Sequence, residues 1–154
     1  KGERDPAMHA FGEALATGAS TAYGAEAALR LGELLTGAGR FDEAETRLND
    51  AATRAAAPDL IGLRARAYVG LARNAETRGD EAAALRYYMS VGILFDDPVL
   101  VPEALQKSAA LLDKAGRAEE AQAMREELKT RYPASPFAKP LQTGAAFKAR
   151  KGCV

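Results

Sequence analysis

The sequence predicts an all-α protein built as a solenoid of antiparallel helix pairs, with about three full repeats after a leading half repeat. Three observations support this prediction. A glycine followed by acidic residues and then by an alanine recurs at Gly2, Gly39, Gly79 and Gly116. Apolar residues on both sides of each glycine return every three to four positions, as on one face of a helix. The repeating units close with Pro58, Pro98 and Pro133, and proline does not continue a helix.

Each part of the recurring motif has a physical role. We expect the glycine to end one helix in the left-handed conformation, which glycine adopts at little cost. The acidic residues then lie in the first turn of the next helix, where the helix dipole favours negative charge. Small side chains five positions after the glycine let two helices approach closely, and these are Ala7, Ala44, Ala84 and Ala121. Pro6 stands just inside a helix start, where proline is tolerated.

The motif predicts the elements in chain order. We expect helices over residues 5–17, 21–37, 41–56, 59–77, 80–95, 101–115 and 117–131. Residues 1–20 then hold the second helix of an incomplete N-terminal repeat, and full repeats follow at 21–58, 59–98 (a long one) and 99–133. Residues 134–154 form a basic tail. Because the first unit lacks a first helix, we expect either a piece of a longer protein or a start that carries an incomplete repeat.

Two stretches make the pattern specific, LRLGELLTGAGRFDEAETRLNDA at 29–51 and EALQKSAALLDKAGRAEEAQAMREELKTRYP at 103–133. Their spacing of large residues, glycine, alanine and proline resembles the tetratricopeptide repeat family over about residues 2–133. The chain departs from the family where Ala28 replaces an aromatic residue and where Tyr87 and Tyr88 are shifted in the long repeat. The resemblance implies a right-handed superhelix whose first helices line a concave, peptide-binding groove.

The family's groove positions can be carried over residue by residue. They fall on Glu26, Leu29, Glu33, Thr36, Arg66, Val69, Arg73, Glu76, Glu103, Gln106, Ala110 and Asp113; Lys107 and Lys114 lie at the edge, and Arg30 is also counted among the groove residues. Arg66 and Arg73 are the best candidates for an anionic peptide, because arginine can hold a carboxylate through two hydrogen bonds. The family's clamp for a terminal carboxylate uses lysine and asparagine, and this sequence has Leu29, Glu33, Val69 and Arg73 at those positions. We therefore do not transfer that specificity.

The sequence offers no residues for catalysis, for a cofactor or for a metal. His9 is the single histidine and falls on the outer side of its helix, and Cys153 has no second cysteine to pair with. The glycines stand singly, whereas phosphate-binding loops need them clustered. Adjacent acids such as Glu119 and Glu120 point in different directions on a helix. We therefore predict a protein that is not an enzyme.

Charge bears on partners and location. The last acidic residue is Glu127, and the six cations that follow it leave 15 cations against 21 carboxylates in the rest of the chain. An acidic body with interspersed cations is not typical of nucleic-acid binding, and no apolar run is long enough for a membrane span. The basic tail is either a solvated segment or one that docks on an acidic surface, its own body included, or on anionic lipid.

The tail also bears on location. Its start, Tyr132-Pro133 with Ser135-Pro136, resembles the ends of repeats in bacterial cell-envelope members of the family, such as Tol-Pal-associated and outer-membrane-assembly proteins. The resemblance favours the periplasm or envelope over the cytoplasm. We also expect Phe137, Leu141 and Phe147 to lie across the last repeat.

Two functions follow. The first is a non-catalytic scaffold that binds a peptide or a partner helix in the groove. The alternative is self-association, or an accessory helical domain of a larger bacterial envelope protein or enzyme. In the second case the N-terminal helix, with Phe11 on its apolar face, would mediate a homodimer.

Overall fold

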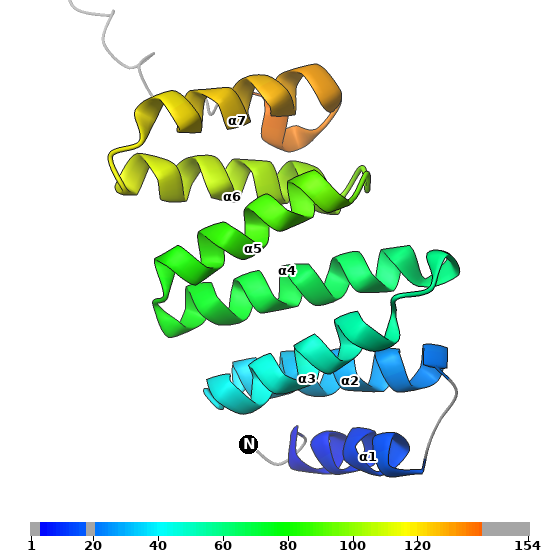
Figure 1. Ribbon diagram of the computed structural model, residues 1–154. Helices are drawn as coiled ribbons and strands as arrows, with labels where there is room; N and C mark the ends of the chain where they lie inside the picture. The colour runs from blue at the N-terminus through cyan, green and yellow to red at the C-terminus, as the bar shows by residue number, and fades with distance from the viewer. Residues whose placement is uncertain (1–3, 18–20, 140–154) are drawn as a thin grey trace, which may run out of the picture.

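Seven α-helices follow one another in the computed structural model, which describes residues 4–17 and 21–139 (Figure 1). They are α1 (Arg4–Ala16), α2 (Thr21–Gly37), α3 (Phe41–Arg54), α4 (Ile61–Arg78), α5 (Glu81–Leu94), α6 (Leu100–Lys114) and α7 (Ala118–Arg131). Two short 3₁₀ helices, η1 (Pro58–Leu60) and η2 (Pro136–Ala138), precede α4 and follow α7. No strand occurs within the described ranges, so the predicted all-α class is confirmed.

Three glycines end α2, α4 and α6 in the same way. Gly39, Gly79 and Gly116 have φ angles of 76°, 87° and 74°, in the left-handed region that the motif predicts. The amide after each glycine donates to a carbonyl oxygen five residues earlier, and these bonds are Arg40 to Leu35, Asp80 to Ala75 and Arg117 to Leu112, each at 2.9 Å. Each corner thus satisfies carbonyls that a helix end would otherwise leave unpaired.

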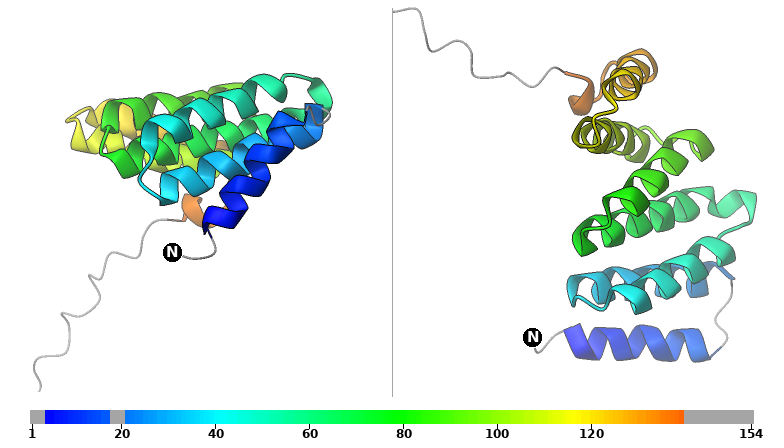
Figure 2. Two further views of the ribbon diagram at one scale, coloured as in Figure 1. Left: turned by 90° about the horizontal axis from the view of Figure 1, so that it is seen from below. Right: turned by 60° about the vertical axis from the view of Figure 1, so that its left-hand side comes forward.

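The helices pack on their neighbours in chain order, so that helix pairs lie one above the other (Figure 2). Beyond these neighbours, α2 also contacts α4, and α4 contacts α6. The alanines five residues after the three glycine corners, Ala44, Ala84 and Ala121, have no exposed surface. Their burial at the helix seams agrees with the predicted role of these three alanines, whereas Ala7 of α1 is only partly buried.

Leu48 of α3 joins three helices in the first half of the stack. Its side chain is fully buried, and it occupies space that Gly32 of α2 and Gly70 of α4 leave open. A Cβ atom at Gly32 would lie 2.6 Å from Leu48 Cγ, and one at Gly70 would lie 2.7 Å from Leu48 Cδ2. Both distances are far below van der Waals contact, so a methyl group at either position would require Leu48 to shift.

The second half of the stack has the larger core. Tyr88 of α5 is its largest fully buried side chain, and Val91, Val101 and Leu105 belong to the same cluster. The rings of Tyr68 and Phe95 meet edge to face, with centroids 5.5 Å apart, which is a favoured aromatic arrangement. This core holds α4, α5 and α6 together and fixes the surface on which the candidate site lies.

The helix ends lie within two residues of the predicted ones. The start of α4 differs because Pro58–Leu60 form a 3₁₀ turn, so the α-helix begins at Ile61 and not at 59. Beyond α7, Ser135 accepts a hydrogen bond from Phe137 N and caps η2, as expected for a serine that caps a short turn. Leu141 and Phe147, expected across the last repeat, lie outside the described residues.

No helix in the described part of the chain combines the length and the apolarity that a bilayer crossing requires.

Candidate functional site

A cavity of about 410 Å³ lies on the face formed by α2, α4 and α6. Its lining residues are Glu33, Thr36, Arg66, Val69, Gly70, Arg73 and Leu100. Five of these residues are groove positions that the repeat register predicts, and they come from two successive repeats. The cavity combines an apolar part with two guanidinium groups, a carboxylate and a hydroxyl.

Arg66 lies at one end of the cavity in a cluster of charges that joins α2 to α4. Its two terminal nitrogens donate to the two carboxylate oxygens of Glu26, at 3.0 and 3.1 Å. Glu26 also accepts from Arg30 at 2.8 Å, and Arg30 bonds Glu33 at 3.1 Å. Burial alone would raise the pKa of Glu26, but the hydrogen bonds and charges of Arg66 and Arg30 outweigh it and lower that pKa. Arg66 is therefore committed to its own carboxylate neighbour.

Arg73 joins α4 to α6 in a different way. Its Nη2 atom alone donates to both carboxylate oxygens of Glu103, at 2.8 and 3.0 Å. No other described residue accepts from its Nε or Nη1 atoms, and 54% of the side chain is exposed. The hydrogen bond to Glu103 raises the pKa of Arg73 despite partial burial. Arg73 thus keeps two nitrogen donors for a ligand while one is held in place.

A third connection across repeats lies further along α4. Glu76 accepts from Lys107 Nζ of α6 at 2.7 Å and from the Tyr88 hydroxyl of α5 at 2.8 Å. Burial would raise the pKa of Glu76, yet these two hydrogen bonds and the lysine charge hold it below its usual value. Burial and the bond to Glu76 raise the pKa of Tyr88, so its hydroxyl stays protonated and donates. Glu76 and Lys107 therefore tie α4 to α6 at this point.

Asn74 supports the cavity from behind. It is 3% exposed, accepts from Thr36 Oγ1 at 2.9 Å, and donates from Nδ2 to Phe41 O at 3.0 Å. One amide thereby fixes the end of α2, the start of α3 and the middle of α4 relative to one another. Because buried amides are costly when unpaired, this arrangement holds Thr36 at the cavity wall.

The predicted groove residues divide by position. Glu33, Arg66, Val69 and Arg73 line the cavity, Glu26 and Arg30 lie beside it, and Glu76 and Lys107 form the next connection. Gln106 lines a different cavity of about 380 Å³ at the C-terminal end, together with Asp113, Leu128 and Phe137. Leu29 was expected at the groove surface, and this is wrong: it is fully buried and packs in the core with Leu48.

Sequence reasoning missed two lining residues. Gly70 has no side chain to give it a place in an apolar stripe, although its contact with Leu48 explains why glycine stands there. Leu100 begins α6 one residue before the predicted start of that helix, so it fell outside the register. The position of Leu100 directly after the Asp-Asp-Pro-Val connection could have identified it as the first apolar residue of α6.

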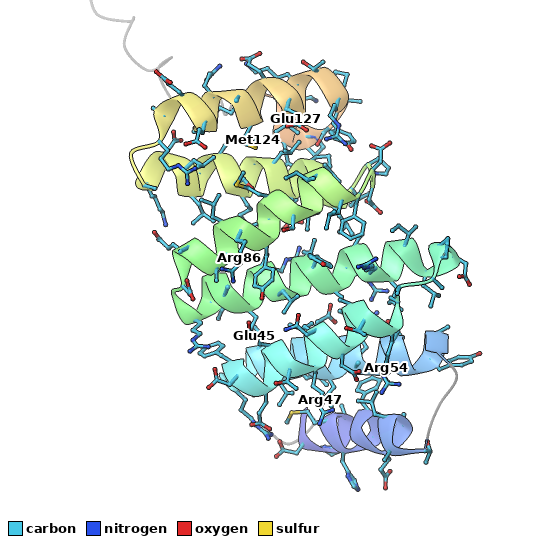
Figure 3. The ribbon with its side chains drawn as sticks, in the orientation of Figure 1. Glu45, Arg47, Arg54, Arg86, Met124 and Glu127 are labelled. Carbon is cyan, nitrogen blue, oxygen red and sulfur yellow. The ribbon has the colours of Figure 1, made fainter. Side chains whose placement is uncertain are left out.

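The titratable groups of the groove are arginine–carboxylate and lysine–carboxylate pairs, which suit noncovalent binding. Across residues 4–17 and 21–139, no three histidine, cysteine, aspartate or glutamate side chains cluster in a way that could hold a metal ion. His9 is exposed, 3.5 Å from the Glu13 carboxylate on the same helix. The face of α3, α5 and α7 seen in Figure 3 carries a separate set of charges, including Glu45, Arg47 and Arg86.

Comparison of the chain with protein-family models, with curated proteins and with solved structures finds no match in any of the three.

Proposed function

We propose that this protein is a non-catalytic interaction scaffold that binds a peptide segment or a partner helix in the groove of α2, α4 and α6. The proposal takes the helix pairs as tetratricopeptide-like repeats, three full ones after a half repeat, wound as a right-handed superhelix. The single observation that supports it best is the cavity itself. Groove residues of two successive repeats, Glu33 and Thr36 with Arg66 and Arg73, line one hollow of about 410 Å³.

The chemistry of the cavity describes the ligand. Val69 and Leu100 supply an apolar surface, and Gly70 adds no side chain of its own to fill the hollow. Arg73 supplies unpaired N–H donors beside it, and hydrogen bonds to a charged group contribute about 1.5–3 kcal/mol. The ligand is therefore a peptide with a bulky apolar residue next to an acidic one, the apolar side chain in the hollow and the carboxylate at Arg73.

A charge-reversal pair tests this proposal. Peptides selected by the full chain from a randomised displayed library are titrated by fluorescence anisotropy against the parent protein, Arg73→Glu and Arg47→Glu. Arg47 is an exposed arginine of α3 outside the cavity, so its reversal changes the net charge equally. We expect Arg73→Glu to weaken binding about tenfold or more and Arg47→Glu to change it less than about twofold. Equal loss in both variants, or none in either, would refute the groove.

A second function is favoured by one feature of α1. From Asp5 to Ala16 no side chain of this helix is buried, although Met8, Phe11 and Leu15 pack against Leu31, Leu35 and Ala44. An outer helix covered on one side only fits self-association, or stacking on a further helical unit of a larger protein. Phe11, expected at the dimer contact, is packed within the chain, so the test uses Ala10, an exposed position of α1. Light scattering over a concentration series decides: dimers that Ala10→Glu abolishes support this function, and a monomer at all concentrations contradicts it.

A further inference from the structure

The connections between repeats lie together at one edge of the molecule. In Figure 1, α3 and α5 end and α4 and α6 begin at the same side, and the three glycine corners lie at the opposite side. We call this side the connection edge and define it by residues 21–24, 55–61 and 93–99. It is separate from the cavity of the proposed function, whose lining includes none of these residues and comes next to them in sequence at Leu100.

The connection edge carries most of the exposed large apolar side chains. In the described part of the chain these are Tyr23, Ile61, Ile93, Leu94, Val99 and Phe137, and the first five belong to the edge. Tyr23, Ile61 and Val99 stand 38 residues apart and are 76%, 50% and 70% exposed. Scattered exposed apolar residues need no explanation. These three residues, however, stand at the start of the first helix of three successive repeats and so form a row, which indicates a binding surface.

The same edge is acidic. Residues 55–61 and 93–99 contain Asp59, Asp96 and Asp97 and no lysine or arginine. Asp97 is used locally, because it accepts from the amides of residues 99 and 100 and begins α6. Asp96 accepts from the Tyr132 hydroxyl at 2.7 Å and from Arg131 at 3.4 Å, yet 88% of its side chain stays exposed. The edge already binds a cation from the end of α7 and has carboxylate surface left.

One segment of the chain matches this surface in composition. Residues 140–154, which lie outside the described residues, contain Leu141, Phe147, Lys148, Arg150 and Lys151 and no acidic side chain. We propose that the connection edge binds segment 140–154, with its apolar residues on the row and its cations at Asp59 and Asp96. Complementary charge and apolar surface carry this assignment, and the acidity of the edge disfavours anionic lipid as its partner.

The reach of the chain allows this contact. Residues 137–139, which directly precede the segment, line a cavity with Gln106, Ala110 and Asp113 of α6, so the segment follows a point about 9–20 Å along α6 from its start. Fourteen extended residues, as from 140 to 153, span up to about 46–50 Å. Two helix layers separate the starts of α6 and α4, a distance of about 16–20 Å. A segment of this length can therefore run back along α6 to Val99 and on to Ile61.

A spin label tests the proposal on the full chain. Cys153 is the single cysteine, so a nitroxide attaches there without mutation, and amide signals are compared between its oxidised and reduced forms. We expect the signals of residues 59–61 and 93–99 to lose more than about half their intensity, because a bound segment holds the label within range. The amides at the opposite glycine corners, residues 39–41 and 79–81, serve as internal controls and retain theirs.

Two variants and one mixture complete the test. The exposed substitutions Ile93→Ser, Leu94→Ser and Val99→Ser together, or Lys148→Gln, Arg150→Gln and Lys151→Gln together, are expected to restore the lost intensities without changing the helical circular dichroism. A mixture of isotope-labelled and spin-labelled copies shows which copy supplies the segment. If the segment binds its own copy, the amide signals of the isotope-labelled copy keep their intensity. If it binds a second copy, they lose intensity. Retained signals at the connection edge overturn the proposal, as does signal loss at residues 33, 66 and 73 instead.

Discussion

Replacing Leu48 by alanine tests the central packing of the first half of the stack. Leu48 is fully buried between Gly32 and Gly70. Buried leucine-to-alanine substitutions cost about 2–5 kcal/mol, and the cost rises with the cavity that remains. Here two of the surrounding residues are glycines, which have no side chains to relax into the gap. We therefore expect a loss of about 3–5 kcal/mol in the free energy of unfolding, measured by urea denaturation followed by circular dichroism.

A double-mutant cycle with Gly32→Ala separates packing from helix propensity. Alanine in place of glycine in a helix gains about 0.5–1 kcal/mol from propensity alone. The added Cβ would lie 2.6 Å from Leu48 Cγ and 3.3 Å from Ala44 O, and such overpacking costs about 1–3 kcal/mol. Gly32→Ala alone is therefore expected to destabilise the protein. In the Leu48→Ala background the same Cβ enters vacated space, so the substitution becomes neutral or stabilising.

The sign of the coupling energy between the two substitutions shows whether Leu48 fills the space left by Gly32. We expect the two changes to be non-additive by about 1–3 kcal/mol, in the direction that the double variant is more stable than the sum of the single losses. Additive losses would show that Leu48 does not fill the space left by Gly32. Melting temperatures supply an independent reading, because 1 kcal/mol corresponds to about 2–4 °C for a chain of this size.

Four further outcomes follow from single side chains. Because the pKa of Glu76 is lowered in the folded protein, its charge stabilises the fold above about pH 4.5, and this stabilisation is lost as the pH falls through the lower folded pKa. In Glu76→Gln, the free energy of unfolding measured in urea should therefore fall less steeply below about pH 5 than in the parent protein. Asn74→Ala leaves Phe41 O without its side-chain donor and should cost about 1–3 kcal/mol in the same assay. Ser108 is fully buried and its hydroxyl has no described partner, so Ser108→Ala should raise the melting temperature. Gly79→Ala meets no atom within 4 Å but has φ 87°, so it should cost about 1–2 kcal/mol from backbone strain alone.

The helices and their corners could be predicted because their signals are local. A glycine with positive φ, acids in the next turn and an apolar stripe of period 3.6 all lie within one or two turns of the feature that they specify. Gly39, Gly79 and Gly116 therefore mark the corners, and no helix end is off by more than two residues. The least accurate start, that of α4, falls where a proline begins a 3₁₀ turn that apolar periodicity does not detect.

The groove was predicted less completely, because its properties depend on distant pairs. The repeat register places Arg66 and Arg73 on one face, but their carboxylate partners stand 40 and 30 residues away, at Glu26 and Glu103. Register gives the side of the helix on which a residue lies and not whether two long side chains meet. Leu29 shows the same limit, since its helical position suits the groove while its side chain fills the core beside Leu48.

For the proposed peptide ligand, the pairing of the two arginines favours Arg73 over Arg66 as the contact, a distinction that the sequence alone does not give. Exposed ion pairs contribute about 0–1 kcal/mol, so an incoming carboxylate can share or replace the single-nitrogen contact of Arg73 with Glu103 at little cost. Arg66 is bonded through two nitrogens to Glu26, which Arg30 also holds, so a ligand there would have to disrupt a linked set of charges. Because Arg73 also joins α4 to α6, a ligand bound at this residue contacts the seam between two helices. Binding at Arg73 should therefore change the stability of the α4–α6 contact. Binding at Arg66 would first have to disrupt the ion pair between Arg66 and Glu26.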